Sequence, residues 1–253
     1  MPRRSLADQA YAHLKDWVVH HRLKPGARLR VGDLARVLQM SPTPVREALS
    51  MLEKEQLVAR EPRRGFHVSA LDLEGVADLY DLRIALEALA ARQAASRISA
   101  ADRTRLSHLL AAVERCIDSG DKPHILDLEQ DFHLLIFEAS RNRPLAEMGR
   151  SILGRIWMIQ NVNLMTTDHL HQAHPQHVGI FQAIAAGQAR RAELLMRRHL
   201  AFARQFVLSR LRRKDDLLAH ILLGYEEAAP PGPGRAGRAR KAERRRAVPR
   251  AGG

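Results

Sequence analysis

Apolar residues recur three or four positions apart along most of this chain, which is the spacing of one buried face of an α-helix. Before residue 40 the pattern predicts two short helices. The first begins after Ser5, which forms a capping-box pattern with Asp8. Lys24-Pro25-Gly26 interrupts the pattern, and a second helix is expected over residues 31–38.

A third helix is expected to begin at Ser41, in the run SPTPVREAL. Serine is a good N-cap residue, and Pro42 suits the first helical position, where its missing N–H costs nothing. The apolar positions that follow are Val45, Ala48, Leu49 and Leu52. Thr43 and Arg46 therefore fall on the opposite, polar face, which suits insertion into the major groove of DNA.

Two short extended segments follow, at residues 57–60 and 66–69, joined by the turn Glu61-Pro62-Arg63-Arg64-Gly65. They predict a two-stranded wing with a basic tip. The order of elements is that of a helix-turn-helix followed by a wing.

From residue 73 onward the pattern is helical throughout, and no strand is expected. The predicted helices cover residues 75–97, 100–119, 123–140, 144–161, 175–186 and 189–212, with a shorter piece near 217–223. Residues 168–174, which end at Pro175, are expected to form a loop. The predicted fold is mainly α: an N-terminal winged helix-turn-helix with a small β-hairpin wing, and then an all-α antiparallel bundle.

Length and charge divide the chain into three parts, at residues 1–70, 71–228 and 229–253. The first is the candidate DNA-binding domain and the last is a tail, while the resemblance given below implies effector binding and dimerisation for the second. The net charge of +13 comes from +6 in the first part and +7 in the tail, because residues 71–228 are neutral. Positive charge confined to the candidate DNA reader is what phosphate contact requires.

The tail is rich in Pro, Gly, Ala and Arg and is predicted to be disordered. It is either a solvated extension or a non-specific nucleic-acid arm. The single cysteine, Cys116, excludes an internal disulfide. No secretory signal or membrane-spanning apolar run is evident, so we expect a soluble, cytoplasmic protein without membrane contact.

Four polar residues stand among the apolar faces of the predicted bundle: Glu129, His133, His177 and His199. Such groups need partners in a core. A divalent transition metal would satisfy all four, with zinc preferred and nickel or manganese as alternatives. Any one histidine could instead be a hydrogen-bonded core imidazole, and Glu129 with His133 could be a surface pair. His174, in the expected loop, competes with His177 as a ligand, and we favour His177.

Residues 5–70 resemble the winged helix of GntR-type transcription regulators, through LKPGARLRVGDLARVLQMSPTPVREALSMLEKEQLVAREPRRGFHV. The resemblance implies DNA contact by Ser41, Thr43, Arg46 and Gly65, with Arg63 and Arg64 as local basic support. The family usually has arginine directly after the capping serine, and Pro42 here removes one expected contact. Arg46 could alternatively be a solvated arginine paired with Glu47 or Glu53.

Residues 73–210 resemble the FCD branch of that family, through YDLRIALEALAARQAA, DFHLLIFEASRNRPL and HVGIFQAIAAGQARRAELLMRRHL. This branch commonly binds a metal through an acid and three histidines and often senses small organic acids. The acid is usually aspartate, and Glu129 stands in its place here. Arg83 resembles an arginine that faces the family's pocket and could bind the effector's carboxylate. It could equally pair with Glu87, four residues on.

The sequence therefore predicts a non-enzymatic transcription regulator, a repressor in most of this family. It would act as a homodimer on a near-palindromic double-stranded operator and respond to a small carboxylate. Two other classes stay open: a metal-dependent, hydrolase-like enzyme and a sequence-indifferent DNA-binding protein that uses the basic tail.

Overall fold

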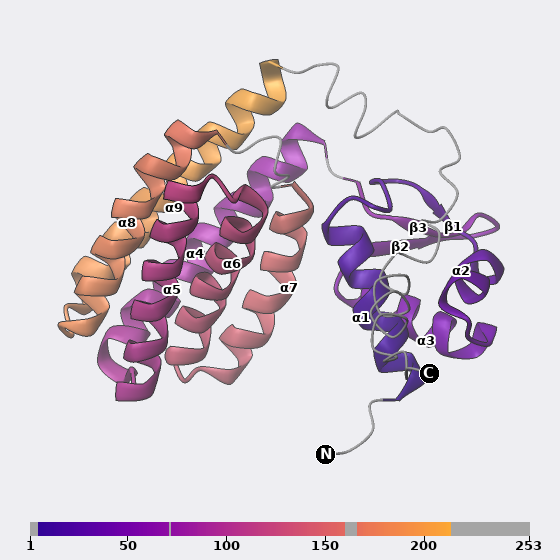
Figure 1. Cartoon of the computed structure of the whole chain (residues 1–253), viewed down its shortest axis with the longest axis horizontal. Coiled ribbons are helices and arrows are strands. Elements are labelled where there is room, and N and C mark those ends of the chain that lie inside the picture. The colour runs from indigo at the N-terminus through magenta and orange to yellow at the C-terminus, as the bar shows by residue number, and fades with distance from the viewer. Residues whose placement is uncertain (1–4, 71, 160–165, 214–253) are drawn as a thin grey trace, which may run out of the picture.

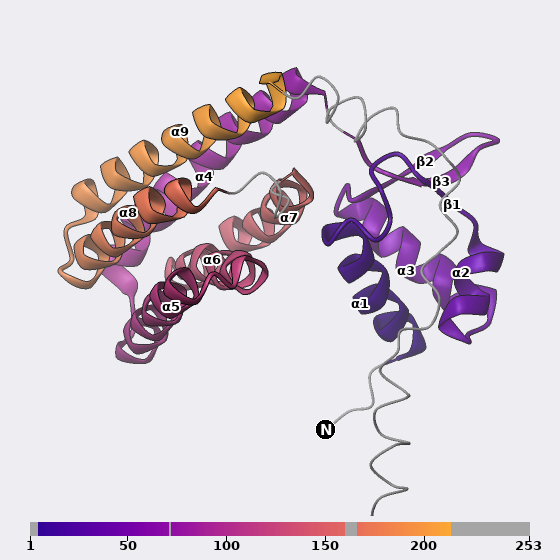
Figure 2. The same cartoon turned by 45° about the horizontal axis from the view of Figure 1, so that its top comes forward.

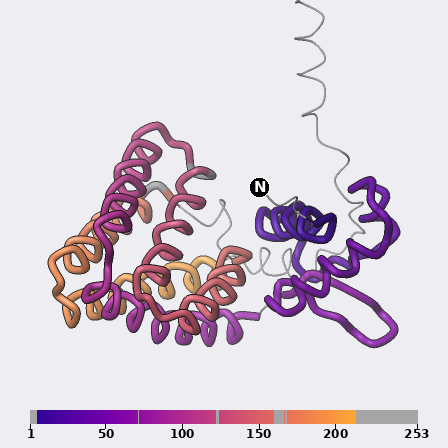
Figure 3. Tube along the Cα trace, turned by 90° about the horizontal axis from the view of Figure 1, so that it is seen from below, coloured from indigo at the N-terminus to yellow at the C-terminus, as the bar shows by residue number. Residues whose placement is uncertain are grey.

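The chain forms two bodies that stand side by side (Figures 1 and 3). The computed structural model describes residues 5–70, 72–159 and 166–213. We call residues 5–70 the head and residues 72–213 the body. Each has its own cluster of buried apolar side chains. The mainly α fold predicted from the sequence is confirmed.

The head contains the three predicted helices: α1 (Leu6–Val19), α2 (Val31–Leu38) and α3 (Pro42–Lys54). The capping box at the start of α1 is present, because the Ser5 hydroxyl accepts from the Asp8 N–H and the Asp8 carboxylate accepts from the Ser5 N–H. The left-handed residue Gln39 ends α2 and turns the chain into α3. The predicted apolar face of α3 packs against α1 in the core of the head.

The predicted two-stranded wing is present as an antiparallel hairpin, and a third strand that the sequence did not predict joins it to form a three-stranded antiparallel sheet. The strands are β1 (Arg28–Leu29), β2 (Val58–Glu61) and β3 (Gly65–Val68), in the order β1-β3-β2. In this register Arg28 pairs with His67 and Arg60 with Phe66. A two-residue strand is too short to produce an alternating pattern, which is why β1 escaped detection.

The body consists of the helices α4 (Leu73–Arg97), α5 (Ala100–Ser119), α6 (Lys122–Ala139), α7 (Arg143–Ile159), α8 (Thr167–Ala185) and α9 (Ala189–Arg213). The long helices α4 and α9 lie side by side and antiparallel (Figure 2), with ion pairs Arg92–Glu193 at 3.7 Å and Asp81–Arg204 at 3.1 Å. Helices α6, α7 and α8 also pack against α4, and α5 packs against α6 and α8. No helix within the described ranges is long and apolar enough to cross a membrane.

Helix α8 begins at Thr167, so the prediction of a loop over residues 168–174 was wrong. The Thr166 hydroxyl caps the helix by accepting from the His169 N–H. Pro175 lies inside the helix, where proline removes only one backbone hydrogen bond. The predicted helical piece near 217–223 and the tail at 229–253 lie outside the described residues.

The end of α7 contacts the head directly. Met158 belongs to the buried apolar cluster of the head, where its side chain is 8% exposed. Gly154 faces Leu57, since a Cβ added at Gly154 would lie 3.6 Å from the Leu57 Cδ2. The Arg155 Nη1 donates to the Gln56 Oε1 at 2.6 Å. Because Gln56 and Leu57 follow α3, this contact holds the end of the body close to α3.

Candidate nucleic-acid interface and metal centre

Helix α3 presents its polar face to solvent, as the sequence predicts. Ser41, Thr43 and Arg46 are exposed, while the apolar face of the helix is buried in the head. Ser41 is the N-cap residue, but its exposed hydroxyl makes no capping hydrogen bond. Arg46 forms no ion pair with any residue that the structure describes, so pairing with Glu47 or Glu53 is not observed.

The wing carries its basic residues at an exposed turn. Arg63 has a left-handed φ of 66° and Gly65 a φ of 80°, which bends the chain between β2 and β3. The Arg64 guanidinium lies 3.4 Å from the Glu61 carboxylate, an exposed pair. Such a pair contributes little and can exchange Glu61 for a phosphate.

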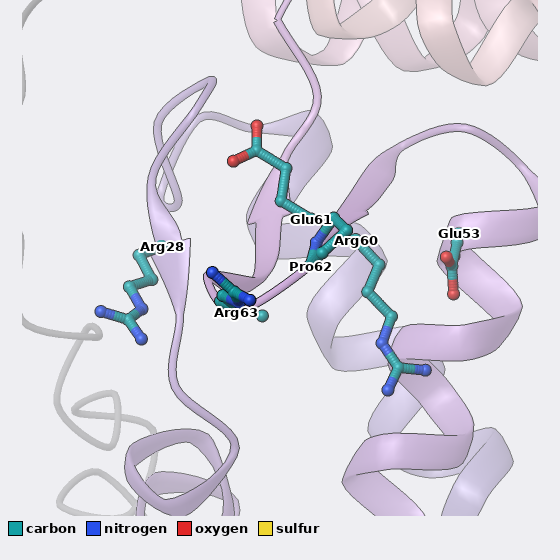
Figure 4. A pocket seen from close by; sticks show the side chains of 7 residues that line it. Arg28, Glu53, Arg60, Glu61, Pro62 and Arg63 are labelled. Atoms are coloured by element: carbon teal, nitrogen blue, oxygen red, sulfur yellow. The ribbon is translucent and has the colours of Figure 1, made fainter.

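A hollow of about 520 Å³ lies between the wing and the end of α3 (Figure 4). It brings together three arginine side chains from three different segments: Arg28 of β1, Arg60 of β2 and Arg63 of the turn. Glu53 and Glu61 also line it. The sequence prediction missed Arg28 and Arg60, because placing them beside Arg63 required the register of the three-stranded sheet. Arginines gathered beside an exposed helix suit contact with DNA phosphates.

The body brings together three of the four predicted metal ligands. His133 of α6, His177 of α8 and His199 of α9 each offer a ring nitrogen, and these atoms lie within 4.8 Å of one another. The His177 Nε2 and the His199 Nε2 are 2.9 Å apart. All three side chains are buried. We call this group the histidine triad.

Glu129 stands at the edge of the triad and is not one of the group. Its Oε1 is 3.8 Å from the His177 Nδ1, and this buried oxygen has no hydrogen-bond partner among the described residues. Burial raises the pKa of Glu129 to about 7, against the opposing effect of Arg83. The coordination predicted for Glu129 therefore stays a prediction.

Hydrogen bonds at the far side of two rings orient the triad. The His133 Nδ1 lies 2.5 Å from the Glu87 Oε2, and the His199 Nδ1 lies 3.2 Å from the Gln176 Oε1. If each Nδ1 carries the proton, each Nε2 has its lone pair free for a ligand. Burial lowers the pKa of His133, and it lowers the pKa values of His177 and His199 further. Neutral imidazoles are the form that binds metal.

The donor set fits a divalent transition metal. Three neutral, buried imidazoles converge, and a carboxylate oxygen without a partner stands next to them. A cation would compensate the charge of this buried carboxylate. It would also coordinate the His177 and His199 Nε2 atoms, which lie next to each other. His174, the competing candidate, is not part of the triad, although it lies on the same helix.

Arg83 is buried, and of the two arrangements that the sequence left open the pair with Glu87 is observed. Its Nε donates to the Glu87 Oε1 at 2.5 Å, so the intrahelical pair is present. Its Nη1 is buried without a hydrogen-bond partner among the described residues. Glu87 thus joins Arg83 to His133, a contact that the sequence did not predict. The available signal was an arginine and a glutamate four residues apart in an alanine-rich stripe of α4.

Two family models match this chain, one over the head and one over the body. Residues 6–68 match the model of the bacterial regulatory proteins of the gntR family, and residues 78–202 match the FCD domain. The HTH-type transcriptional regulator YdhC of Bacillus subtilis is 27% identical over 85% of this chain and 91% of its own. The HTH-type transcriptional repressor GlaR of Escherichia coli is 29% identical over 75% of this chain and 90% of its own.

A solved structure shares the whole fold. Escherichia coli McbR/YncC superposes with a TM-score of 0.73 at 24% identity, over 84% of this chain and 100% of that one. The relatives named above are transcriptional regulators, and an enzymatic role for the triad is set aside accordingly. The chain therefore belongs to the GntR family of DNA-binding transcriptional regulators and carries an FCD domain.

Proposed function

We propose that this regulator is a homodimeric repressor that leaves its operator, or binds it differently, when a small carboxylic acid occupies a metal site in the body. One observation carries the proposal: an exposed basic reading surface on the head coexists with a buried, ligand-ready histidine triad in the body. The repressor role is supported by the printed name of the GlaR relative. We retain the cytoplasmic location, because an operator-binding protein works beside the chromosome.

The division into domains at 1–70, 71–228 and 229–253 is part of the proposal. It is supported by the separate apolar clusters of head and body. The assignment of Ser41, Thr43, Arg46, Arg63, Arg64 and Gly65 to DNA contact is supported by their exposure. The two heads of a two-fold symmetric dimer would then read the two halves of a near-palindromic operator.

The DNA contact is tested by Arg46→Ala in a gel-shift titration, with an operator first selected from random duplexes by repeated rounds of binding. If Arg46 touches a base, operator affinity should fall roughly 5- to 150-fold. Arg103→Ala is the matched control, because Arg103 is an exposed arginine of the body. Unchanged affinity of the Arg46→Ala protein would remove Arg46 from the reading surface.

The same titration separates a specific regulator from a sequence-indifferent DNA protein. An excess of unrelated duplex should leave a specific protein on its operator and should strip an indifferent one from it. Removal of residues 229–253 should change the salt dependence of binding only if the basic tail contacts phosphate.

For the metal, we assign His133, His177 and His199 as ligands, with Glu129 as the fourth, and zinc as the ion, with nickel or manganese as alternatives. When bound, the ion would supply positive charge and, on expansion beyond four ligands, a coordination position for a carboxylate oxygen. His177→Ala should lose the bound metal in elemental analysis of the purified protein. His174→Ala is the control on the same helix and should retain it. Full retention by the His177→Ala protein would contradict the assignment.

The proposed role of Arg83 is to bind the carboxylate of the effector through its Nη1, which has no partner inside the described fold. A buried, charged donor of this kind favours a carboxylate over neutral ligands. A thermal-shift screen of small carboxylates with and without a chelator tests this. Stabilisation that disappears with the chelator, and that Arg83→Lys reduces, is the expected result. Equal stabilisation with and without the chelator would separate the acid from the metal.

Exposed leucines on the body support the dimer. Leu82 and Leu89 lie two turns apart on α4, and both are at least 40% exposed. Leu194 of α9, the helix that packs along α4, is exposed as well. Leu82→Glu with Leu89→Glu should yield monomers in sedimentation, whereas a wild-type monomer would refute the dimer. Effector coupling between two dimer states is typically worth about 1–3 kcal/mol.

A further inference from the structure

His169 is a buried histidine that the triad does not use. Its side chain is 5% exposed, and its ring stacks on Phe202 and Phe206 of α9, with centroids 4.9 Å and 3.8 Å away. The His169 Nδ1 is buried and has no hydrogen-bond partner among the described residues. Buried polar atoms in folded proteins nearly always have a partner. This nitrogen therefore indicates a partner that the described fold does not supply.

His169 lies on the same face of α8 as His177, eight residues nearer the N-terminus. Two helical turns of this length correspond to about 12 Å along the helix axis. The residue one turn from His177 toward His169 is Ala173, and the residue one turn from His199 toward Phe206 is Ala203. Both alanines are buried. Between the triad and His169, α8 and α9 each therefore place a small side chain, Ala173 and Ala203.

The protonation state of His169 limits what its partner can be. Burial lowers the pKa of His169 to about 4, so its ring is neutral at pH 7. A neutral imidazole offers one donor and one acceptor. It suits a hydroxyl or carbonyl group, since a second buried carboxylate would lack a compensating charge.

We propose that His169 binds the uncharged polar end of the effector, a monocarboxylic acid whose carboxylate lies at the triad and whose hydroxyl or carbonyl oxygen lies about two helical turns away. The inference rests on the proposed carboxylate sensing and adds the chemical class and length of the ligand. An extended six-carbon hydroxy acid spans roughly 8 Å, and a hydrogen bond at its far end adds about 3 Å. This total matches the separation along α8.

The test compares two probes on the zinc-loaded full chain by calorimetric titration: hexanoate and 6-hydroxyhexanoate. Wild-type protein should bind the hydroxy acid roughly fivefold more tightly, because it gains one hydrogen bond. His169→Phe keeps an aromatic ring for the stack and should abolish the preference. His169→Asn keeps a polar group near the Nδ1 position and should retain part of it. His171→Phe, at an exposed position of the same helix, should behave as wild type.

Zinc content, measured on each protein, should be equal, because His169 is not among the proposed ligands. Equal affinity of the wild-type protein for the two acids overturns the role of His169 and leaves carboxylate sensing intact. A preference that persists in the His169→Phe protein overturns it too. Failure of the zinc-loaded wild type to bind either acid defeats the proposed carboxylate sensing itself, and the inference with it.

Discussion

Replacement of Glu87 by glutamine should destabilise the body strongly, although it hardly changes the shape of the side chain. Its carboxylate is fully buried and contacts Arg83 through one oxygen and His133 through the other, each at 2.5 Å. Glu87→Gln keeps the volume and removes the charge. Arg83 then remains buried without its main counterion, and the amide cannot serve both partners as the carboxylate does.

The size of the effect follows from the pKa of Glu87. Burial raises this pKa, but Arg83 and then His133 outweigh burial and hold it at about 2, against an ordinary value of 4.5. A lowering of this size corresponds to about 3 kcal/mol of stability at neutral pH. The cost of breaking a buried ion pair by removing one partner is of the same order, about 3–5 kcal/mol. We therefore expect Glu87→Gln to lower the free energy of unfolding by about 3 kcal/mol.

The assay is urea denaturation of chelator-treated protein, followed by circular dichroism. Glu147→Gln is the matched control, because Glu147 also pairs with an arginine four residues away, Arg143 at 2.9 Å, but is 57% exposed. It should cost no more than about 0.5 kcal/mol. Because the folded pKa of Glu87 is lowered, its contribution is complete above about pH 4.5 and is lost as the pH falls toward 2.

The difference in the free energy of unfolding between wild type and Glu87→Gln should therefore decrease by about 1 kcal/mol between pH 7 and pH 3.5. The reasoning is refuted if this difference is below about 1 kcal/mol at pH 7, or if it increases on acidification.

Three other perturbations test the packing and the metal centre. Gly149→Ala should lower the free energy of unfolding by about 1–3 kcal/mol, because the added Cβ would lie 2.6 Å from the Phe137 ring. Gly32→Ala is the control and should not destabilise the protein, because its Cβ would have nothing within 4 Å. Equal shifts of the unfolding temperature in the two variants would contradict this reasoning. Met158→Ala should cost about 2 kcal/mol and separate the unfolding of head and body in calorimetry, and a single unaltered transition would count against the contact. Chelation of zinc-loaded wild type should lower its unfolding temperature, while a Tm insensitive to chelator would argue against a structural contribution of the ion.

The sequence predicted those features that depend on local chemistry. The capping box of Ser5 and Asp8 forms at the start of α1, as the residue types predicted. The outward direction of Thr43 and Arg46 followed from the apolar spacing of α3. In each case a few neighbouring residues determine the outcome.

The features that escaped prediction depend on contacts far apart in the chain. Glu87 of α4 contacts both Arg83 of the same helix and His133 of α6, and the apolar spacing of the sequence does not predict the contact between the two helices. The burial of His169 followed from α8 extending upstream of Pro175, a residue that usually marks a helix boundary. The histidine triad was predicted from its place in the apolar stripes, but the position of Glu129 at its edge depends on how α6 is turned against α8.

The contacts of Met158, Arg155 and Gly154 with the head affect whether head and body separate after the backbone is cleaved. The polypeptide joins head and body once, near residue 70, whereas α7 holds them together a second time without a covalent bond. A protease that nicks the backbone after Ala70 would therefore yield two fragments that still elute as one particle. They should separate only when urea or a substitution at the end of α7 disrupts the noncovalent contact between α7 and the head.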